Sequence, residues 1–195
     1  MKRKQPAKPA PVERDERVRH SKKTVLMATY KLLSEAGLSG VSVDAVSKRS
    51  GVAKTTIYRH WPSRSALLLD ACSNMGSRPQ APDTGSLKGD LELLVKHTAQ
   101  QLRTAPWATV APSIIDAAER DQELANVHAR THSGVRTPFQ TVIERAQQRG
   151  ELSRDLDPSH VIAAIFGPLF YRRWFSREPL DEAFTKSVVE RAIRK

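Results

Sequence analysis

The stretch Gly51-Val-Ala-Lys-Thr-Thr-Ile-Tyr-Arg-His-Trp-Pro-Ser-Arg64 decides the fold, because it predicts a sharp turn, a short helix and the start of another helix. Gly51 tolerates the positive φ that a tight turn between helices requires. Pro62 disfavours the α conformation at Trp61 and so ends the short helix, and Ser63 is a suitable N-cap for the next one. The short helix carries many hydrogen-bond donors and few apolar residues, so we expect its surface to face an anion.

Length and composition predict a soluble globular protein. The chain has 195 residues, of which 39% are hydrophobic, and a mean hydropathy of −0.49. No apolar run approaches the ~20 residues that a membrane span needs, and the N-terminus lacks the apolar segment of a signal peptide. The single cysteine, Cys72, excludes an internal disulfide and suits a reducing compartment. We therefore expect a cytoplasmic protein that does not enter a membrane.

Positive charge is concentrated near the N-terminus. The net charge is +11; residues 1–64 hold 15 Lys or Arg against 5 Asp or Glu, whereas residues 65–195 hold 17 against 16. Such asymmetry is typical of a nucleic-acid-binding module joined to a neutral body, although a basic surface that is merely solvated has the same net charge.

The N-terminal third predicts a basic arm followed by three helices. Residues 1–17 combine lysines and prolines with almost no apolar residue, so we expect a flexible arm that either follows a nucleic acid or only aids solubility. Apolar spacing predicts helices over 21–36 and 43–50, followed by the short helix after Gly51. Helices joined by a short glycine-containing turn form a helix-turn-helix module.

The remainder also predicts helices, separated by a loop over 76–85. We expect a first helix from Ser63 toward Met75. Further helices are expected over 87–102, from 107, over 122–149, over 158–175 and over 180–193. Gly134 and Pro138 should bend or split the long helix, and Pro168 should kink the most apolar one. With no alternating strand pattern and no repeat, the fold class is all-α, with about nine helices.

Residues 21–75 resemble the DNA-binding domain of the TetR family of bacterial transcriptional regulators. The matching residues are Ala36-Gly37, Ser42-Val43, Gly51-Val52 and Thr56-Ile57-Tyr58-Arg59-His60-Trp61 followed by Arg64. The family usually has lysine where this chain has Arg64, and either cation can meet a phosphate. The resemblance implies a DNA-binding head over 18–64. It also implies a ligand-binding and dimerising body over 65–195, whose last two helices form a four-helix bundle with a second copy.

Residue types divide the head's candidate DNA contacts into two groups. Hydroxyls and cations that can clamp the phosphate backbone are Ser42, Thr56, Tyr58, His60 and Arg64. Candidates for reading base edges are Lys54, Thr55 and Arg59, with Tyr58 able to do either. We expect Trp61 only to pack the core of the head.

The body offers candidates for a ligand pocket and for the dimer interface implied by the resemblance. Large apolar residues that can enclose a cavity are Trp107, Ile114, Ile115, Phe139, Val142 and Phe166, although most large apolar residues are plain core. Asp116, Glu119 and His97 are polar groups that can orient a ligand. The expected dimer contacts are Ile162, Ile165, Leu169, Trp174, Phe184 and Val188.

Two further features predict no site. His128 and His132 are spaced like a pair of metal ligands, but no third ligand lies at a suitable spacing. Cys72 is better explained as a small apolar residue than as a redox switch. We therefore expect neither a metal nor another cofactor.

These patterns predict a ligand-responsive transcriptional regulator, most simply a repressor, that binds a near-palindromic DNA operator as a homodimer and is released by a small molecule. Two alternatives stay open: a non-specific architectural DNA-binding protein, and a small-molecule-binding protein or enzyme without a DNA role. The sequence contains no nucleophile–base constellation and no glycine-rich phosphate loop, so we expect no enzyme.

Overall fold

The computed structural model describes residues 11–73, 79–105 and 107–194, and within these ranges it contains nine α-helices and no strand. The prediction of an all-α fold is therefore confirmed. The chain divides into two compact units, Met1–Ala71 and Cys72–Lys195, each with its own core. The division falls inside a helix, after Ala71, whereas the sequence suggested a boundary after Arg64.

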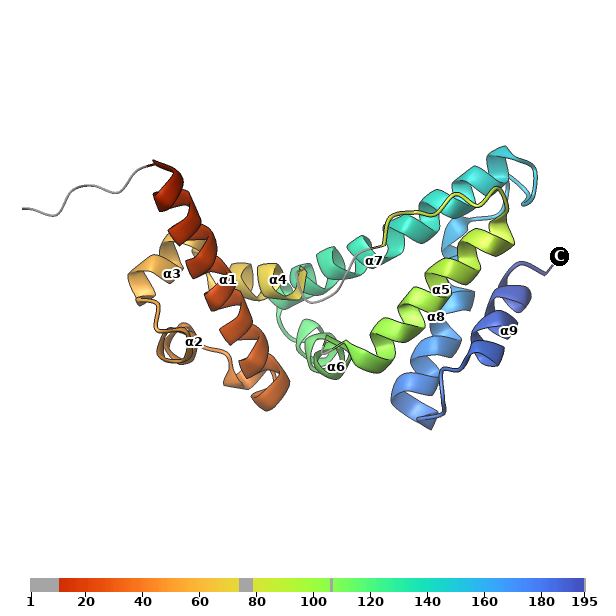
Figure 1. Ribbon diagram of the computed structural model, residues 1–195. Coiled ribbons are helices and arrows are strands. Elements are labelled where there is room, and N and C mark those ends of the chain that lie inside the picture. Colours follow the sequence, from red (N-terminus) through yellow and green to blue (C-terminus); the bar gives the residue numbers. More distant parts are fainter. Residues whose placement is uncertain (1–10, 74–78, 106, 195) are drawn as a thin grey trace, which may run out of the picture. The chain divides into compact units, whose positions relative to one another are not determined.

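The first unit contains α1 (Pro11–Ala36), α2 (Val43–Ser50), α3 (Lys54–His60) and most of α4 (Arg64–Ser73). A short 3-10 turn, Leu38–Gly40, links α1 to α2. α1 packs against α2, and α2 against α3 (Figure 1). The core of this unit is formed by buried apolar residues from all of these helices: Val25, Leu33, Val46, Ile57, Trp61, Leu67 and Leu68.

Helix α1 begins earlier than the apolar pattern suggested. It starts at Pro11, so the expected flexible arm over 1–17 is wrong for residues 11–17, and residues 1–10 lie outside the described ranges. Proline is favoured in the first turn of a helix because its missing N–H has no helical partner there. Apart from Val12, residues 12–17 are all charged, and a helix without an apolar stripe gives no periodic signal.

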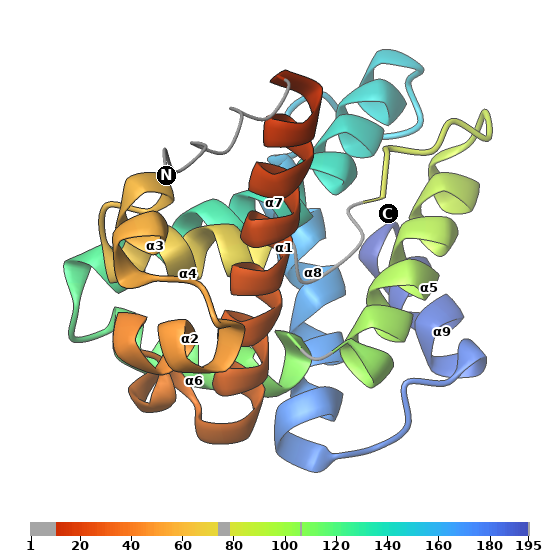
Figure 2. The ribbon, with the colours of Figure 1, turned by 60° about the vertical axis from the view of Figure 1, so that its left-hand side comes forward.

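The second unit contains α5 (Leu87–Thr104), α6 (Trp107–Ala118), α7 (Gln122–Gln148), α8 (Pro158–Phe170), a π-helical segment (Tyr171–Ser176) and α9 (Glu182–Ala192). Four of these helices form a closed circuit, in which α5 contacts α7, α7 contacts α8, α8 contacts α9 and α9 contacts α5. α5, α8 and α9 lie side by side (Figure 2). Between them lies a core that includes Leu91, Leu94, Phe139, Ile143, Ile165 and Val189.

Two helices of this unit contain an internal proline. α7 runs as one helix through Gly134 and Pro138, so these residues do not split it. Its apolar residues on both sides of Pro138 are buried, and this packing outweighs the local cost of a proline. In α8 the α-helix continues past Pro168 and changes to a π-helix at Tyr171.

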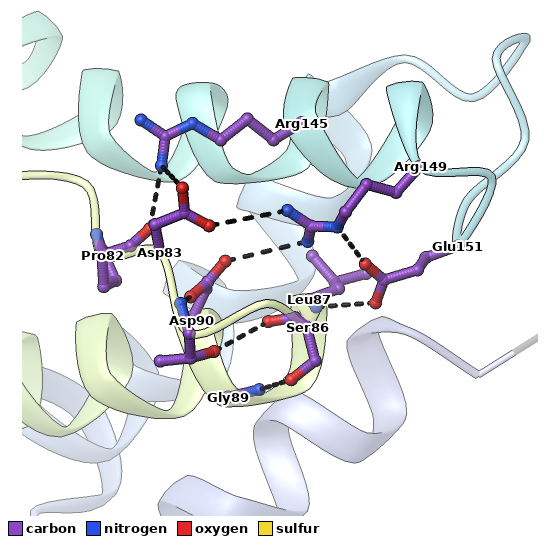
Figure 3. A network of polar contacts seen from close by, with 10 residues as sticks. Pro82, Asp83, Ser86, Leu87, Gly89, Asp90, Arg145, Arg149 and Glu151 are labelled. Atoms are coloured by element: carbon purple, nitrogen blue, oxygen red, sulfur yellow. Dashed lines mark hydrogen bonds and ion pairs between the residues drawn. The ribbon is translucent and has the colours of Figure 1, made fainter.

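Charged side chains fasten the segment before α5 to the end of α7 (Figure 3). The guanidinium of Arg149 lies 3.8 Å from the carboxylate of Asp90 and 4.0 Å from that of Asp83, and it donates to Glu151 at 2.6 Å. Arg145 donates to the carbonyl of Pro82 at 3.0 Å. Because Asp90 is completely buried, its negative charge needs a nearby positive charge, and Arg149 provides it.

Backbone groups complete this network. The N–H of Thr84 donates to Asp90 at 2.6 Å, and the N–H of Leu87 donates to Glu151 at 2.7 Å. The Leu87 bond lowers the pKa of Glu151 against the opposing effect of burial, and Arg149 lowers that pKa further. The first turn of α5 is thereby tied to the residues that follow α7.

Candidate functional site

The turn between α2 and α3 is built as the sequence predicted. Gly51 adopts φ 71°, in the left-handed region that favours glycine. The hydroxyl of Ser47 donates to the carbonyl of Val52 at 2.8 Å, which fixes the turn from the α2 side. Ser63 caps α4 by accepting from the N–H of Ala66 at 3.1 Å. These local bonds hold α3 in one orientation relative to α2.

One face of α3 is buried and the opposite face is exposed. Ile57 is completely buried and packs α3 into the first unit, and Trp61, just after α3, is also buried. Exposed α3 residues are Lys54, Thr55, Tyr58 and Arg59, whereas Thr56 and His60 are half-buried. Tyr58 exposes 52% of its surface, which is far more than a tyrosine in a core does. The exposed face is a row of hydrogen-bond donors that can reach phosphates or base edges.

Lys54 already has a partner. Its ammonium forms an ion pair with Asp44, a residue in the first turn of α2. Both side chains are more than half exposed, so the pair contributes little to stability and can exchange for a phosphate or a base at small cost. Ser42, the residue that caps α2 by accepting from Ala45 at 3.0 Å, stays exposed beside Asp44.

Arg64 has an internal role that its place in the motif does not suggest. Its guanidinium donates to the carbonyl of Val41 at 2.7 Å and to that of Leu38 at 2.5 Å. These carbonyls lie in the link between α1 and α2, so Arg64 ties α4 to that link. Arg64 is therefore an internal brace in the free protein, and its contact with a phosphate stays a prediction; sequence spacing shows a cation but not the carbonyls that accept from it.

Replacing Arg64 by alanine is expected to lower the free energy of unfolding by about 2 kcal/mol, because two carbonyls lose a charged donor. The matched control is Arg59→Ala on the exposed face of α3, which should leave the melting temperature almost unchanged. Thermal unfolding followed by circular dichroism compares the two variants. Equal melting temperatures for both would contradict the bracing role.

His60 lies in surroundings that lower the pKa of its ring. Burial lowers its pKa below the ordinary value, and the nearby cations Lys22 and Arg59 lower it further. The ring of His60 lies edge-on to that of Trp61, with centroids 5.8 Å apart. The indole N–H of Trp61 donates to Asp70 at 2.8 Å. Trp61 therefore packs the core, whereas His60 remains a neutral group near the exposed face.

The second unit contains a cavity of about 140 Å³ lined by residues between Cys72 and Trp174. Of the six residues expected to line a pocket, Trp107, Ile114, Ile115, Phe139 and Phe166 line this cavity; Val142 is buried elsewhere in the core. Of the three polar candidates, His97 lines it, whereas Asp116 and Glu119 do not. Asp116 instead forms an ion pair with Arg120.

Sequence reasoning missed several lining residues. His128 and His132 were weighed only as metal ligands, but both line the cavity, with ring centroids 6.1 Å apart. Phe170 and Trp174 also line it. Spacing on one helix could have placed His128 and His132 together, but it could not show that a cavity lies beside them. No group of three residues that could hold a metal exists among those described.

Cys72 is buried and also lines the cavity. Burial raises the pKa of its thiol to about 11, so the thiolate that oxidation requires is scarce near neutral pH. This agrees with the interpretation of Cys72 as a small apolar residue.

The residues expected at a dimer interface are mostly internal to this chain. Ile162, Ile165, Leu169 and Val188 are buried in the core of the second unit and cannot reach a partner, so this expectation is corrected for them. Trp174 is half-buried at the cavity and donates its N–H to the carbonyl of Ala108 at 3.1 Å. Phe184 is half-buried beneath the guanidinium of Arg172, 3.6 Å from the ring centroid.

The opposite face of α8 is exposed and was not predicted. It consists of small residues followed by two aromatic ones: Ala163, Ala164, Gly167, Pro168, Tyr171 and Phe175. The rings of Tyr171 and Phe175 stack with centroids 6.0 Å apart, and Phe175 exposes 76% of its surface. We call this set the α8 outer face. Some apolar residues of α8 are buried and others are exposed. Hydropathy alone cannot distinguish the two groups.

Among the described residues, no helix is both long and apolar enough to cross a membrane.

Comparison with known proteins finds similarity over both units. Residues 25–71 match the family described as bacterial regulatory proteins, tetR family, and residues 81–192 match the family described as tetracyclin repressor-like, C-terminal domain. The helix-turn-helix-type transcriptional regulator YdeS of Bacillus subtilis is 32% identical over 88% of this chain and 87% of its own length. The DNA-binding transcriptional repressor TetR of Mycobacteroides abscessus is 29% identical over 85% of this chain and 88% of its own length.

Solved structures show the same architecture. The TetR family transcription regulator SCO0332 superposes with a TM-score of 0.67 and 26% identity, covering 89% of this chain and 97% of that one. FadR from Bacillus subtilis, in complex with stearoyl-CoA, gives a TM-score of 0.69 at 19% identity, covering 88% of this chain and 97% of that one. Family matches over both units and a relative aligned along most of the chain agree with the helix-turn-helix geometry: this chain belongs to the TetR family of transcriptional regulators.

Proposed function

We propose that this regulator is a repressor that binds a near-palindromic DNA operator as a homodimer and leaves it when a small molecule fills the cavity of the second unit. The observation that carries the proposal is the exposed face of α3, where Lys54, Thr55, Tyr58 and Arg59 point away from a helix fixed by the buried Ile57. Donors on a fixed helix suit readout in the major groove. We expect no catalytic activity.

The distribution of positively charged residues along the chain supports DNA binding by the first unit. Residues 1–64 hold most of the excess positive charge, and on α3 the last turn carries Arg59 and His60. Phosphate contacts from this unit supply affinity, whereas Lys54, Thr55 and Arg59 supply sequence preference.

The test is a gel-shift titration with the DNA upstream of the protein's own gene, compared with a scrambled duplex of equal length at about 150 mM salt. A repressor binds the upstream DNA with a preference of about 1,000-fold or more over the scrambled duplex. Equal binding to both duplexes, weakening steeply with salt, identifies an architectural DNA-binding protein instead. Lys54→Ala separates the two further, because a specific regulator loses selectivity at particular base pairs.

Homodimerisation through the α8 outer face is supported by its exposed apolar residues. A Cβ added at Gly167 meets no heavy atom within 4 Å, so another backbone can approach closely there. Gly167→Arg is therefore expected to fold but to shift the protein from dimer to monomer in sedimentation velocity, and to weaken operator binding at least about tenfold. Ala129→Arg, at an exposed position on α7, is the control and should stay dimeric. A dimer that survives Gly167→Arg removes this face from the proposal.

Operator affinity is expected to rise as the pH falls from about 8 to about 6, through the range in which histidine titrates. In the free protein the pKa of His60 lies below its ordinary value. A phosphate beside the ring favours the charged form and raises that pKa, so the complex takes up a proton and acid favours binding. Fluorescence anisotropy at several pH values measures this effect. His60→Gln should remove the slope; an unchanged slope in that variant would show that another group titrates.

Release by a ligand follows from differential affinity. A molecule that binds the cavity more tightly in the conformation unable to bind DNA shifts the population toward that conformation. The same linkage requires operator DNA to weaken ligand binding by the same factor. Measuring ligand affinity with and without operator therefore tests release independently of any structure of the complex.

A further inference from the structure

The wall of the cavity is a continuous row of aromatic rings. Phe139 meets Phe166 edge-on with centroids 5.0 Å apart, Phe166 lies 5.3 Å from Phe170, and Phe170 lies 4.7 Å from Trp174. Trp107 also lines the cavity. Three of these rings lie on α8 and the π-helical segment after it, so one stretch of backbone presents them in a fixed order. Edge-on and offset contacts of this kind extend readily to an aromatic guest.

The cavity provides no charge to neutralise an ion. Among the described residues that line it there is no Asp, Glu, Lys or Arg. Its polar groups are His97, Gln101, His128 and His132, together with two threonines whose hydroxyls already donate to backbone carbonyls in their own helices. Burial lowers the pKa of His132, and His128 and Arg136 lower it further, so its ring is neutral near pH 7. The side chains that line the cavity therefore offer a charged guest no counter-ion.

The volume limits the size of the guest. At about 140 Å³ the cavity is close to the ~150 Å³ of an engineered apolar cavity that binds benzene. A guest of one or two fused rings fits such a space with a modest opening of the walls. A long acyl chain together with a polyphosphate exceeds this volume.

We propose that the effector is an uncharged aromatic molecule of one or two fused rings, carrying a hydroxyl or carbonyl group that meets His128 and His132. The rings of the guest stack on the Phe139–Phe166–Phe170–Trp174 wall. Its polar group exchanges a hydrogen bond with a neutral imidazole, which can donate from one nitrogen and accept at the other. This assignment rests on the proposed role of the cavity as the effector site.

Isothermal titration calorimetry of the purified full-length protein, without DNA, tests the ligand class with named probes. The probe is 2-naphthol, which is bicyclic, neutral and hydroxylated. Three comparison ligands are 1-decanol, which is apolar and hydroxylated but not aromatic, 2-naphthalenesulfonate, which is aromatic but anionic, and stearoyl-CoA. We expect 2-naphthol to bind at least about tenfold more tightly than each of the others.

Matched variants locate the binding site. Phe166→Leu removes a ring from the wall, whereas Leu93→Ala removes an exposed apolar side chain of α5 that lies outside the cavity. The first should weaken 2-naphthol about tenfold and the second should leave it unchanged. Val135→Phe fills the cavity instead of emptying it and should block the probe, which keeps the test valid if Phe166→Leu fails to fold. Thermal unfolding confirms that each variant is folded.

Absence of 2-naphthol binding, binding of 1-decanol or of either anion as tightly as 2-naphthol, or unchanged binding in both folded cavity variants overturns the assignment. None of these outcomes depends on DNA. A protein that binds its operator specifically but rejects 2-naphthol retains the repressor function and loses only the ligand class. A protein that binds 2-naphthol in the cavity but recognises no DNA retains the ligand class and loses the repressor function.

Discussion

Replacing both Lys54 and Arg59 by glutamate is expected to weaken operator binding by about 100-fold or more and to leave the melting temperature nearly unchanged. Both side chains lie on the exposed face of α3, so their loss removes no buried contact. Each change deletes a cation that faces DNA and places a carboxylate against phosphates or base acceptors. Fluorescence anisotropy with a labelled operator gives the affinity, and its salt dependence should become shallower because fewer counterions are released.

The control for this experiment changes the net charge equally at a distance from α3 in the sequence. Lys96 and Arg130 are exposed cations of the second unit, and replacing both by glutamate repeats the charge change. Operator affinity should fall by no more than a few-fold in that control. Equal losses in the two double variants would mean that overall charge, and not the face of α3, holds the DNA.

The second large effect is expected at Arg149, whose replacement by methionine should lower the free energy of unfolding by about 3 kcal/mol. Asp90 is completely buried, and its Oδ2 accepts no hydrogen bond. The positive charge of Arg149, 3.8 Å away, compensates the charge of this oxygen. Methionine keeps most of the aliphatic volume but leaves this carboxylate uncompensated. It also releases Glu151 and Asp83, so the tie between α5 and α7 weakens (Figure 3). Urea denaturation measures the change.

Two further variants separate charge compensation from ordinary loss of an arginine. Arg120 lies between α6 and α7 and forms an exposed ion pair with Asp116. Arg120→Met should lower the free energy of unfolding by less than about 1 kcal/mol. Adding Asp90→Asn to Arg149→Met should recover part of the loss, because the buried group is then neutral. A double variant less stable than Arg149→Met alone would show that Asp90 is stabilised by other means.

Features with a local cause were predictable from the sequence. Gly51 in the turn and Ser63 as the cap of α4 depend on neighbours a few residues away, and both take these roles. The all-α class depends on the period of the apolar residues, which survives errors at individual helix ends. The start of α1 was missed because its first turns carry no apolar stripe.

Features decided by distant contacts were not predictable. The place of Arg64 in the motif predicts a phosphate contact but does not reveal that it also donates to the carbonyls of Val41 and Leu38. Ile162 and Ile165 were assigned to a partner, but other helices of the same chain cover them. Apolar periodicity shows that a residue is buried, but it does not show whether the same chain or a partner chain buries it. The same limit hid Phe170 and Trp174, which join Phe139 and Phe166 in the aromatic wall only after α7 and α8 have packed.

Selection of bound duplexes from a pool of random DNA tests most directly whether the exposed face of α3 reads sequence in the major groove. The expected result is one enriched motif with two inverted half-sites whose centres lie about 10 base pairs apart or a multiple of that spacing. The same selection with Lys54→Ala should relax the preference at particular positions of each half-site. A pool that shows no enrichment with the wild-type protein, or an enriched motif that Lys54, Thr55 and Arg59 variants all leave unchanged, would contradict this role of α3.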